Sequence, residues 1–272
     1  MDSPRAPPPA QAGHPARWHT ALEPRALFEI ALLPWLTPAL LAAPQGDGHP
    51  VLLLPGFLGS EFSLVALQVF LRSRGYAVQT WGLGRNVGFH ARHAQALKQR
   101  IRRLHRETGR KVSLVGWSLG GVFALYGAHE AGACVRSVVT LGSPVTVDLA
   151  RGSQAAPFVQ AIYRLISHPR GPSAHAMQPH ARKLRERDRP AMPVSCLYSI
   201  SDGVVPAQEA TMPRADENIR VPGSHLGLAF NAAVLWIVAD RLAQAEGDWR
   251  PFEPSGPLGY VYRMLTHPAL PL

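Results

Sequence analysis

Short apolar runs alternate with longer amphipathic segments along most of this chain. Each apolar run has the length of a strand, and the run VLLL at residues 51–54 contains no polar position. Strands buried on both faces of a parallel sheet have this continuous pattern, because helices cover both sides. The pattern predicts strands at residues 51–54, 76–81, 112–115, 135–141, 194–200 and 218–221.

The segments between these runs have the spacing of amphipathic helices. In residues 91–107, apolar side chains recur every three or four positions, and lysine and arginine form a separate basic face. Such an apolar stripe faces the core when a helix packs against a sheet. Strands that alternate with helices predict an α/β fold with a mostly parallel central sheet and helices on both faces. The other predicted helices cover residues 61–74, 122–133 and 228–243.

Three stretches interrupt this alternation and set the expected domain organisation. Residues 145–190 contain one apolar helix candidate, at 158–166, and no strand pattern, so we expect a small cap inserted over the site. Residues 1–48 form an N-terminal extension, and residues 246–272 form a tail whose aromatic side chains pack onto the body. We therefore predict one α/β domain at residues 49–272.

The extension itself has two parts. Residues 1–20 are rich in Pro, Ala and Arg, as is typical of a flexible tail. Residues 26–43 are strongly apolar and follow several arginines, a pattern shared with signal sequences and membrane anchors. Glu29, Pro34 and Pro38 inside the run favour instead two short helices, broken near the prolines, that pack on the domain. A role at a membrane surface stays open for this segment.

Composition adds a strong positive charge to this picture. Apolar residues make up 46% of the 272 positions and charged residues 17%, which excludes a disordered chain. The formal net charge of +10 reflects either the base composition of the coding sequence or attraction to an anionic surface. No signature of an RNA- or DNA-binding module accompanies this charge. Cys134 and Cys196 do not form a Cys-x-x-Cys pair, so buried thiols are favoured over a disulfide or a metal site.

One motif carries the expected chemistry. The pentapeptide GWSLG at residues 116–120 follows a predicted strand and precedes a predicted helix. In that context, Gly-x-Ser-x-Gly forms a sharp turn with the serine at its apex, and a Cβ at either glycine would crowd the strand and the helix. The helix N-terminus contributes unpaired N–H groups and a partial positive charge, which favour a developing oxyanion. We therefore predict that Ser118 is a nucleophile.

These features resemble the α/β-hydrolases of the lipase and esterase kind over roughly residues 49–245. In that fold the catalytic residues come in the chain order Ser, acid, His. The resemblance implies Asp202 as the acid, because it begins a loop where a predicted strand ends. It implies His225 as the base, because this residue lies between the last strand and the closing helix. The alternatives are Asp216 and Glu217 for the acid, although both precede a strand, and His267 in the tail for the base.

The resemblance also implies an oxyanion hole made of two backbone N–H groups. One comes from Leu119 and the other from Phe57, in the turn after the first strand. Pro55 stands where many similar lipases have histidine, which leaves the shape of this turn open. For Trp117 the alternative to substrate contact is packing, and for Asn86 it is a turn. The candidate pocket residues are Leu58, Trp117, Asn86, Phe158 and Ile162.

Together these residues predict hydrolysis of a carboxylic ester with an apolar acyl group through an acyl-enzyme on Ser118. The same residues would serve an acyltransferase or a thioesterase, and a membrane-surface binding protein is the alternative outside enzymes. We expect no cofactor and no metal, because the sequence contains neither a dinucleotide-binding glycine pattern nor a metal-ligand spacing. The expected partners are a small-molecule or lipid ester and, weakly, an anionic membrane surface, with no nucleic acid and no obligate protein. The expected location is the cytoplasm, either in solution or at the periphery of a membrane.

Overall fold

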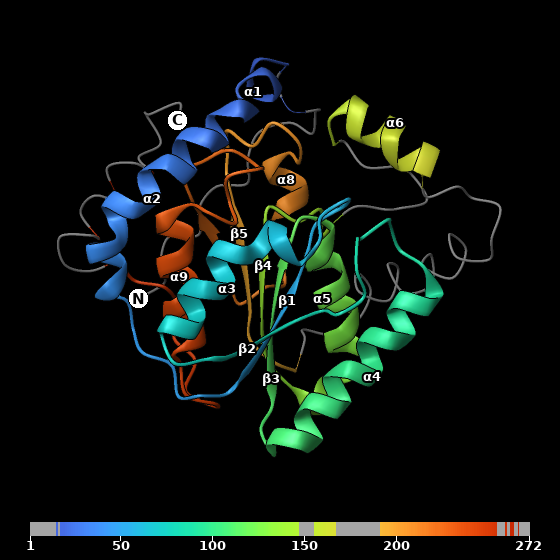
Figure 1. Cartoon of the computed structure of the whole chain (residues 1–272), viewed down its shortest axis with the longest axis vertical. Coiled ribbons are helices and arrows are strands. Elements are labelled where there is room, and N and C mark those ends of the chain that lie inside the picture. Colours follow the sequence, from blue (N-terminus) through green and yellow to red (C-terminus); the bar gives the residue numbers. More distant parts are fainter. Residues whose placement is uncertain are drawn as a thin grey trace.

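Six parallel strands form one sheet in the order β2-β1-β3-β4-β5-β6. The computed structural model describes residues 15, 17–146, 155–166, 191–254, 259, 262, 263 and 266. The chain enters the sheet at β1, moves to the β2 edge, and then crosses to the other side of β1 and continues to β6 (Figure 1). This arrangement confirms the predicted α/β class. The strands are β1 (Pro50–Leu54), β2 (Ala77–Thr80), β3 (Val112–Trp117), β4 (Val135–Leu141), β5 (Val194–Tyr198) and β6 (Glu217–Arg220).

Helices cover both faces of this sheet, and a separate apolar core lies under each layer. Successive side chains of a strand point to opposite faces, so Leu53 packs with one core and Leu52 with the other. Both are fully buried, which explains why this strand has no polar position. One layer contains α3 (Val65–Ser73), which follows the 3-10 turn η2 (Glu61–Leu64), and α9 (Ala232–Leu242). The other contains α4 (Ala91–Thr108) and α5 (Leu119–Glu130).

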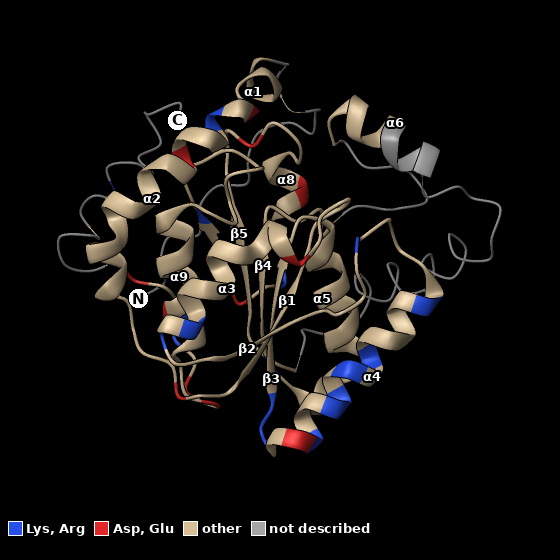
Figure 2. Cartoon of the chain, in the orientation of Figure 1, with Lys and Arg blue, Asp and Glu red and all other residues tan. Residues whose placement is uncertain are grey.

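The apolar stripe predicted for residues 91–107 is buried in α4, and the basic face is on the outside. Leu97 and Ile101 are fully buried in the core shared with α5. Lysine and arginine mark the outer side of α4 along most of its length (Figure 2). The spacing in the sequence therefore predicted the orientation of this helix correctly.

The extension folds as α1 (Arg17–Ala21), η1 (Glu23–Arg25) and α2 (Ala26–Leu41). The prediction of two short helices at 26–43 is wrong, because α2 runs unbroken through Pro34 and Pro38. Each proline removes one N–H donor and crowds the carbonyl four residues earlier. The prolines are four residues apart, so both defects fall on one side of α2, and that side is exposed to water, which can hydrate the freed carbonyls. The opposite side packs against α9.

The predicted cap lies only partly within the described residues. The helix expected at 158–166 is confirmed as α6 (Pro157–Ile166), whereas residues 147–154 and 167–190 lie outside the described part. The N–H of Ala156 donates a hydrogen bond of 2.8 Å to the carbonyl of Val204, so α6 begins beside the loop that follows β5. This loop continues into the short helix α8 (Ala207–Ala210), seen next to α6 in Figure 1.

The described residues of the C-terminal tail pack onto the body, as predicted. Phe252 makes edge-to-face contacts with Trp236 and Tyr262. The hydroxyl of Tyr262 donates a 2.6 Å hydrogen bond to the carbonyl of Arg220. These contacts fix the tail beside β6 and α9.

Both cysteines carry free thiols, and the expectation of a buried thiol is confirmed for Cys196. Cys196 is buried in β5, and this burial raises the pKa of its thiol to about 11. Cys134 is only half-buried, at the end of the 3-10 turn η3 (Gly132–Cys134). A thiol with a pKa this high stays protonated near neutral pH, so Cys196 is a packing residue.

Candidate active site

Ser118 occupies a strained turn between β3 and α5. Its backbone has φ 53° and ψ −125°, a conformation that non-glycine residues rarely adopt. A Cβ added to Gly116 would lie 2.4 Å from the backbone of Gly120, and one added to Gly120 would lie 2.1 Å from the carbonyl oxygen of Leu54. Strand and helix therefore approach so closely that only glycine fits on either side of Ser118. The turn leaves Ser118 half-buried at the carboxyl end of the sheet.

Asp202 and His225 come from two other loops and meet at Ser118. The Nε2 atom of His225 lies 3.0 Å from the Ser118 Oγ, and its Nδ1 lies 2.7 Å from Asp202 Oδ2. The second carboxylate oxygen of Asp202 accepts the N–H groups of Val204 and Val205 at 2.8 and 2.7 Å. These bonds hold the carboxylate, and a proton on Nδ1 leaves Nε2 free to accept the serine hydroxyl. The structure thus brings together the three predicted residues.

The electrostatic surroundings of His225 favour its charged form. Burial of the imidazole lowers its pKa, but the charge of Asp202, the hydrogen bond to that carboxylate and the charge of Glu23 together raise the pKa of His225 above its ordinary value. An imidazole with a raised pKa binds a proton more readily, which is what a base must do when it takes the serine proton.

Gly142, at the end of β4, leaves the space in which the acid and the base meet. It has φ +53°, and a Cβ there would lie 2.5 Å from a methyl of Leu228. The same Cβ would lie 3.0 Å from Asp202 Oδ2 and 3.3 Å from His225 Nδ1. A side chain at this position would therefore press on the hydrogen bond between the two. The sequence gives only a weak signal for this role, a glycine directly after a predicted strand.

The turn after β1 lies against Ser118, as expected for a turn that contributes to an oxyanion hole. A Cβ on Gly56 would lie 3.0 Å from the Ser118 Cβ. Leu58 has φ 60°, and its N–H donates to the carbonyl of Asn86 at 2.7 Å. The predicted donors Phe57 and Leu119 flank this region, Phe57 in the turn and Leu119 as the first residue of α5. Amides in the first turn of a helix have no carbonyl partner within that helix. The role of Phe57 and Leu119 stays a prediction.

Asn86 stabilises this turn from within. Its side chain is fully buried, donates to the carbonyl of Pro55 at 2.8 Å and accepts the N–H of Gly88 at 3.2 Å. Its backbone N–H donates to the carbonyl of Gly59. These contacts agree with the alternative in which Asn86 stabilises a turn and does not contact substrate. They connect the loop after β2 to both ends of the turn after β1.

The other candidate pocket residues differ in their placement. Trp117 is buried in the core beneath the site, and its indole N–H donates to the carbonyl of His225 at 3.1 Å, which agrees with packing. Leu58 is half-buried in the turn, and Phe158 is 49% exposed on α6. Ile162 lies in α6, but its side chain is outside the described part. Contact of any of these residues with a substrate stays a prediction.

The alternative acids lie away from His225. The carboxylate of Asp216 accepts the N–H of Val194, the first residue of β5. Glu217 pairs with Arg241 and accepts the hydroxyl of Ser195 at the start of β5. Both therefore lie at the amino ends of the strands, as their order in the sequence predicted. His267, the alternative base, lies outside the described residues.

A second Asp, His and Ser chain occurs at the amino end of the sheet, and no sequence pattern predicted it. His49 lies 2.5 Å from Asp47 and 2.9 Å from the hydroxyl of Ser113, which in turn contacts Ser137 at 2.9 Å. Ser113 and His49 are completely buried, so no substrate can reach them. Burial also lowers the pKa of His49. These hydrogen bonds satisfy buried polar groups inside the fold. Ser118 differs, because it is only half-buried and lies in a strained turn.

The amino end of the sheet also carries a pocket of about 610 Å³, next to the starts of β4, β5 and β6. Its cationic side chains are already paired: Lys111 with Glu246, Arg136 with Asp47, and Arg241 with Glu217.

Within the described ranges, no group of three or more His, Cys, Asp or Glu side chains could hold a metal ion.

Two glutamates of the extension reach the loops of the site, and neither was among the residues predicted for it. Glu23 accepts the N–H groups of Gly203 and His225, and Glu29 accepts the N–H and hydroxyl of Ser224. Glu29 is the one charged residue in an apolar run of the sequence. This isolated charge could have indicated an acid that faces the inside of the fold. Nothing in the sequence indicates the role of Glu23.

Solved structures provide the comparison that decides the fold. The sequence matches no protein-family model and no curated protein. A lipase of Bacillus licheniformis in its mature form superposes with a TM-score of 0.54 at 17% identity, over 75% of this chain and 95% of that one. The chain has the α/β-hydrolase fold. Aspergillus fumigatus lipase B gives a TM-score of 0.53 at 14% identity over 76% and 56% of the chains. A polyneuridine aldehyde esterase mutant gives a TM-score of 0.50 at 11% identity, over 73% of this chain and 100% of that one.

Within this α/β-hydrolase fold, Gly142→Ala is expected to separate the acid from the base. We expect the rate of p-nitrophenyl butyrate hydrolysis, the reaction predicted from the sequence, to fall about 100-fold, because the new Cβ displaces both partners of a positioning hydrogen bond. Gly109→Ala is the matched control, since Gly109 has φ +65° and nothing within 4 Å of the added Cβ. Both glycines have a positive φ, so an added side chain strains the backbone in both variants. Equal rates for the two variants would contradict the assigned role of Gly142.

Proposed function

We propose that this protein is a serine hydrolase that cleaves carboxylic esters with an apolar acyl group. One observation carries the proposal: a continuous hydrogen-bonded chain runs from the Ser118 hydroxyl through His225 to the buried Asp202 carboxylate. These groups lie at the carboxyl ends of parallel strands, where α/β folds bind their ligands. The solved structures with which the chain superposes include lipases and an esterase, which supports this choice of chemistry.

In the proposed first step, His225 Nε2 takes the hydroxyl proton as Ser118 Oγ attacks the ester carbonyl. Asp202 keeps the other ring proton on Nδ1 and stabilises the imidazolium that forms. The imidazolium then donates its Nε2 proton to the leaving alcohol, and the acyl group stays on Ser118. In the second step, a water molecule gives a proton to Nε2 and attacks the acyl carbonyl, which releases the acid and restores the serine.

The negative charge that develops on the carbonyl oxygen needs donors already in place. In this proposal the N–H groups of Leu119 and Phe57 supply them, one from the first turn of α5 and one from the turn after β1. Asn86 keeps the latter turn rigid through its bonds to Pro55 and Gly88. Each such donor contributes roughly 3 kcal/mol of transition-state stabilisation when it is preorganised.

The apolar acyl group is inferred from apolar side chains on the turns and helices at the carboxyl end of the sheet. Phe57 and Val145 pack against the core under α5, and Val159 on α6 packs against the loop that carries Asp202. An acyl chain in contact with such groups leaves water, and each buried CH₂ contributes about 0.8 kcal/mol to binding. This gain favours substrates with a chain over acetyl esters.

The direct test is hydrolysis of p-nitrophenyl esters of graded acyl length by the purified protein. We expect turnover that increases from acetate to butyrate or longer esters, and a loss of at least about 10³-fold in Ser118→Ala, because the nucleophile is removed. Ser137→Ala is the matched control, since Ser137 lies in the buried polar chain at the other end of the sheet. Hydrolysis that persists in Ser118→Ala would refute the proposed function.

A second proposal concerns where the enzyme acts: we propose that the outer side of α2 rests on a lipid surface. Leu27, Phe28 and Trp35 are 72%, 66% and 82% exposed. Glu29, the one charged residue of α2, lies on the inner side and is bonded to Ser224 and Asn231. An uncharged outer side with exposed aromatic groups suits the interface of a membrane. Among the described residues, no helix is long and apolar enough to cross a bilayer.

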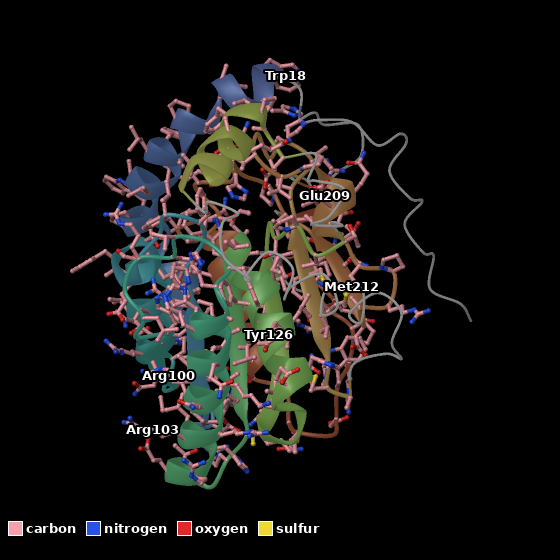
Figure 3. The ribbon with its side chains drawn as sticks, turned by 90° about the vertical axis from the view of Figure 1, so that its right-hand side faces the viewer. Trp18, Arg100, Arg103, Tyr126, Glu209 and Met212 are labelled. Atoms are coloured by element: carbon pink, nitrogen blue, oxygen red, sulfur yellow. The ribbon has the colours of Figure 1, made fainter. Side chains whose placement is uncertain are left out.

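The basic helix α4 is a separate surface. Trp18, which precedes α2, lies at the end of the molecule opposite Arg103 of α4 (Figure 3). The α2 and α4 helices also belong to opposite layers of the fold, since α2 packs on α9 and α4 packs on α5. Apolar and electrostatic binding to a membrane can therefore be tested independently.

Vesicle sedimentation separates these two modes of binding. We expect Phe28→Ser with Trp35→Ser to lower partitioning onto zwitterionic phosphatidylcholine vesicles at least tenfold, because each aromatic side chain gains about 1.5–3 kcal/mol when it leaves water. Arg102→Gln with Arg106→Gln on α4 is the control and should leave that partitioning unchanged. Equal binding by all variants, or binding only to anionic vesicles and only at low salt, would contradict the role of α2.

A further inference from the structure

The carboxylate of Glu23 connects the two loops that carry the proposed acid and base. Its Oε1 accepts the N–H groups of Gly203 and His225 at 2.8 and 2.9 Å, and its Oε2 accepts the N–H of Leu226 at 2.9 Å. Gly203 follows Asp202 directly, so one side chain binds the backbone next to both catalytic candidates. Glu23 is only 5% exposed, so these bonds form away from bulk water.

Neighbouring residues of the extension also hold the acid loop. Arg25 donates to the carbonyl and hydroxyl of Ser201 at 2.8 and 2.7 Å, and Thr20 donates to the carbonyl of Gly203 at 2.6 Å. Packing is equally close, since a Cβ on Gly203 would lie 2.5 Å from the carbonyl oxygen of His19. The extension is therefore fitted to the acid loop over several residues.

Glu29, six residues further along the chain, repeats this arrangement on the base loop. It accepts both the N–H and the hydroxyl of Ser224 at 2.8 Å, and the amide of Asn231 at 2.9 Å. Asn231 in turn caps α9. Ser224 and His225 are consecutive, so two carboxylates of the extension hold two consecutive backbone N–H groups beside the base.

A buried carboxylate is costly unless its oxygens are fully hydrogen-bonded. Glu23 forms no ion pair within the described residues, and its negative charge is stabilised by three backbone N–H groups. Hydrogen bonds to an ionised acceptor are about twice as strong as neutral ones. Each loop loses conformational freedom through these bonds, which is the condition for a fixed distance between His225 and Asp202.

From this geometry we propose that Glu23 is a positioning residue for the proposed ester hydrolysis, acting through the backbone of His225 and Gly203. The inference rests on the proposed function and extends it to the N-terminal extension. Glu23 touches none of the reacting atoms. It sets the register between the acid loop and the base loop, and the α1 to α2 segment becomes part of the active structure.

Glu23 also acts on His225 through its charge. The titratable groups around the imidazole are Asp202 after β5 and Glu23 on the extension, while His19 on α1 interacts with Asp202. The negative charge of Glu23 raises the pKa of His225. Removal of this charge should therefore lower the pKa of His225. The base then stays unprotonated to a lower pH, and the acid limb of the kcat/KM profile shifts to lower pH.

Two substitutions separate geometry from charge. Glu23→Gln keeps the shape but loses the charge and turns an N–H donor toward Leu226, whereas Glu23→Asp keeps the charge and shortens the reach. We expect kcat to fall about 10- to 100-fold in both, with KM within about twofold of the wild-type value. The acid limb should shift to lower pH in Glu23→Gln only. Glu107→Gln, on an exposed pair of α4, is the matched control.

Each outcome decides one claim. If Ser118→Ala hydrolyses esters as fast as wild type in the same assay, the proposed function fails, whatever Glu23 does. If Ser118→Ala is inactive but both Glu23 variants match Glu107→Gln in kcat and in their acid limb, the positioning role of Glu23 is refuted. A fall in kcat together with the predicted difference between the two acid limbs supports it.

Hydrogen exchange on the unmodified protein covers the case in which the variants do not fold. The amides of Gly203, His225 and Leu226 lie in loops, where exchange is ordinarily fast. Bonding to Glu23 should slow their exchange to the rate of the neighbouring strands β5 and β6. Fast exchange at all three amides would overturn the proposal without any substitution.

Discussion

The hydrogen bonds that join Ser118, His225 and Asp202 link three loops that are far apart in the chain, and much of the fold serves to keep their ends in register. Parallel strands place these loops at one edge, because each strand of such a sheet ends on the same side. Close packing of β3 and α5, which only glycine permits at positions 116 and 120, forces Ser118 into its strained turn. The strain is stabilised by the surrounding core, and the N–H of Ser118 is bonded to the carbonyl of Leu141 on β4.

Buried charge is the other constraint at this edge. Asp202 is 3% exposed, and two backbone N–H groups and the imidazole satisfy its oxygens. A carboxylate held in this way keeps the imidazole in one orientation. The extension adds a second set of charge-assisted bonds, from Glu23 on η1 and Glu29 on α2. Glu29 is the one charged residue of α2, so the rest of this helix carries no charge (Figure 2).

Much of this arrangement was predictable from the sequence, because the information is local. The Gly-x-Ser-x-Gly turn, the apolar runs and the apolar stripe of α4 depend on residues close together in the chain. Each has a steric or hydrophobic cause that can be inferred from the sequence. The order of Ser118, Asp202 and His225 then placed the three residues at one sheet edge. Their roles in catalysis stay predictions, as do the two oxyanion donors.

What could not be predicted depends on contacts between distant segments. The continuity of α2 through Pro34 and Pro38 comes from packing on α9 and from an exposed side where water hydrates the carbonyls, and propensity alone argues against it. Glu23 is separated from His225 by 202 positions, so no local pattern indicates their bond. Likewise, the distances among Asp47, His49 and Ser113 resemble those of a catalytic triad, but His49 and Ser113 are completely buried.

The central claim is that the Ser118 hydroxyl is activated by His225, and labelling with a fluorophosphonate followed by peptide mapping tests it most directly. We expect a single phosphonylated peptide containing Ser118, and labelling that is at least about 100-fold slower in His225→Gln but unchanged in His267→Gln. Labelling at another serine, or labelling of Ser118 that depends on His267 and not on His225, would contradict the account.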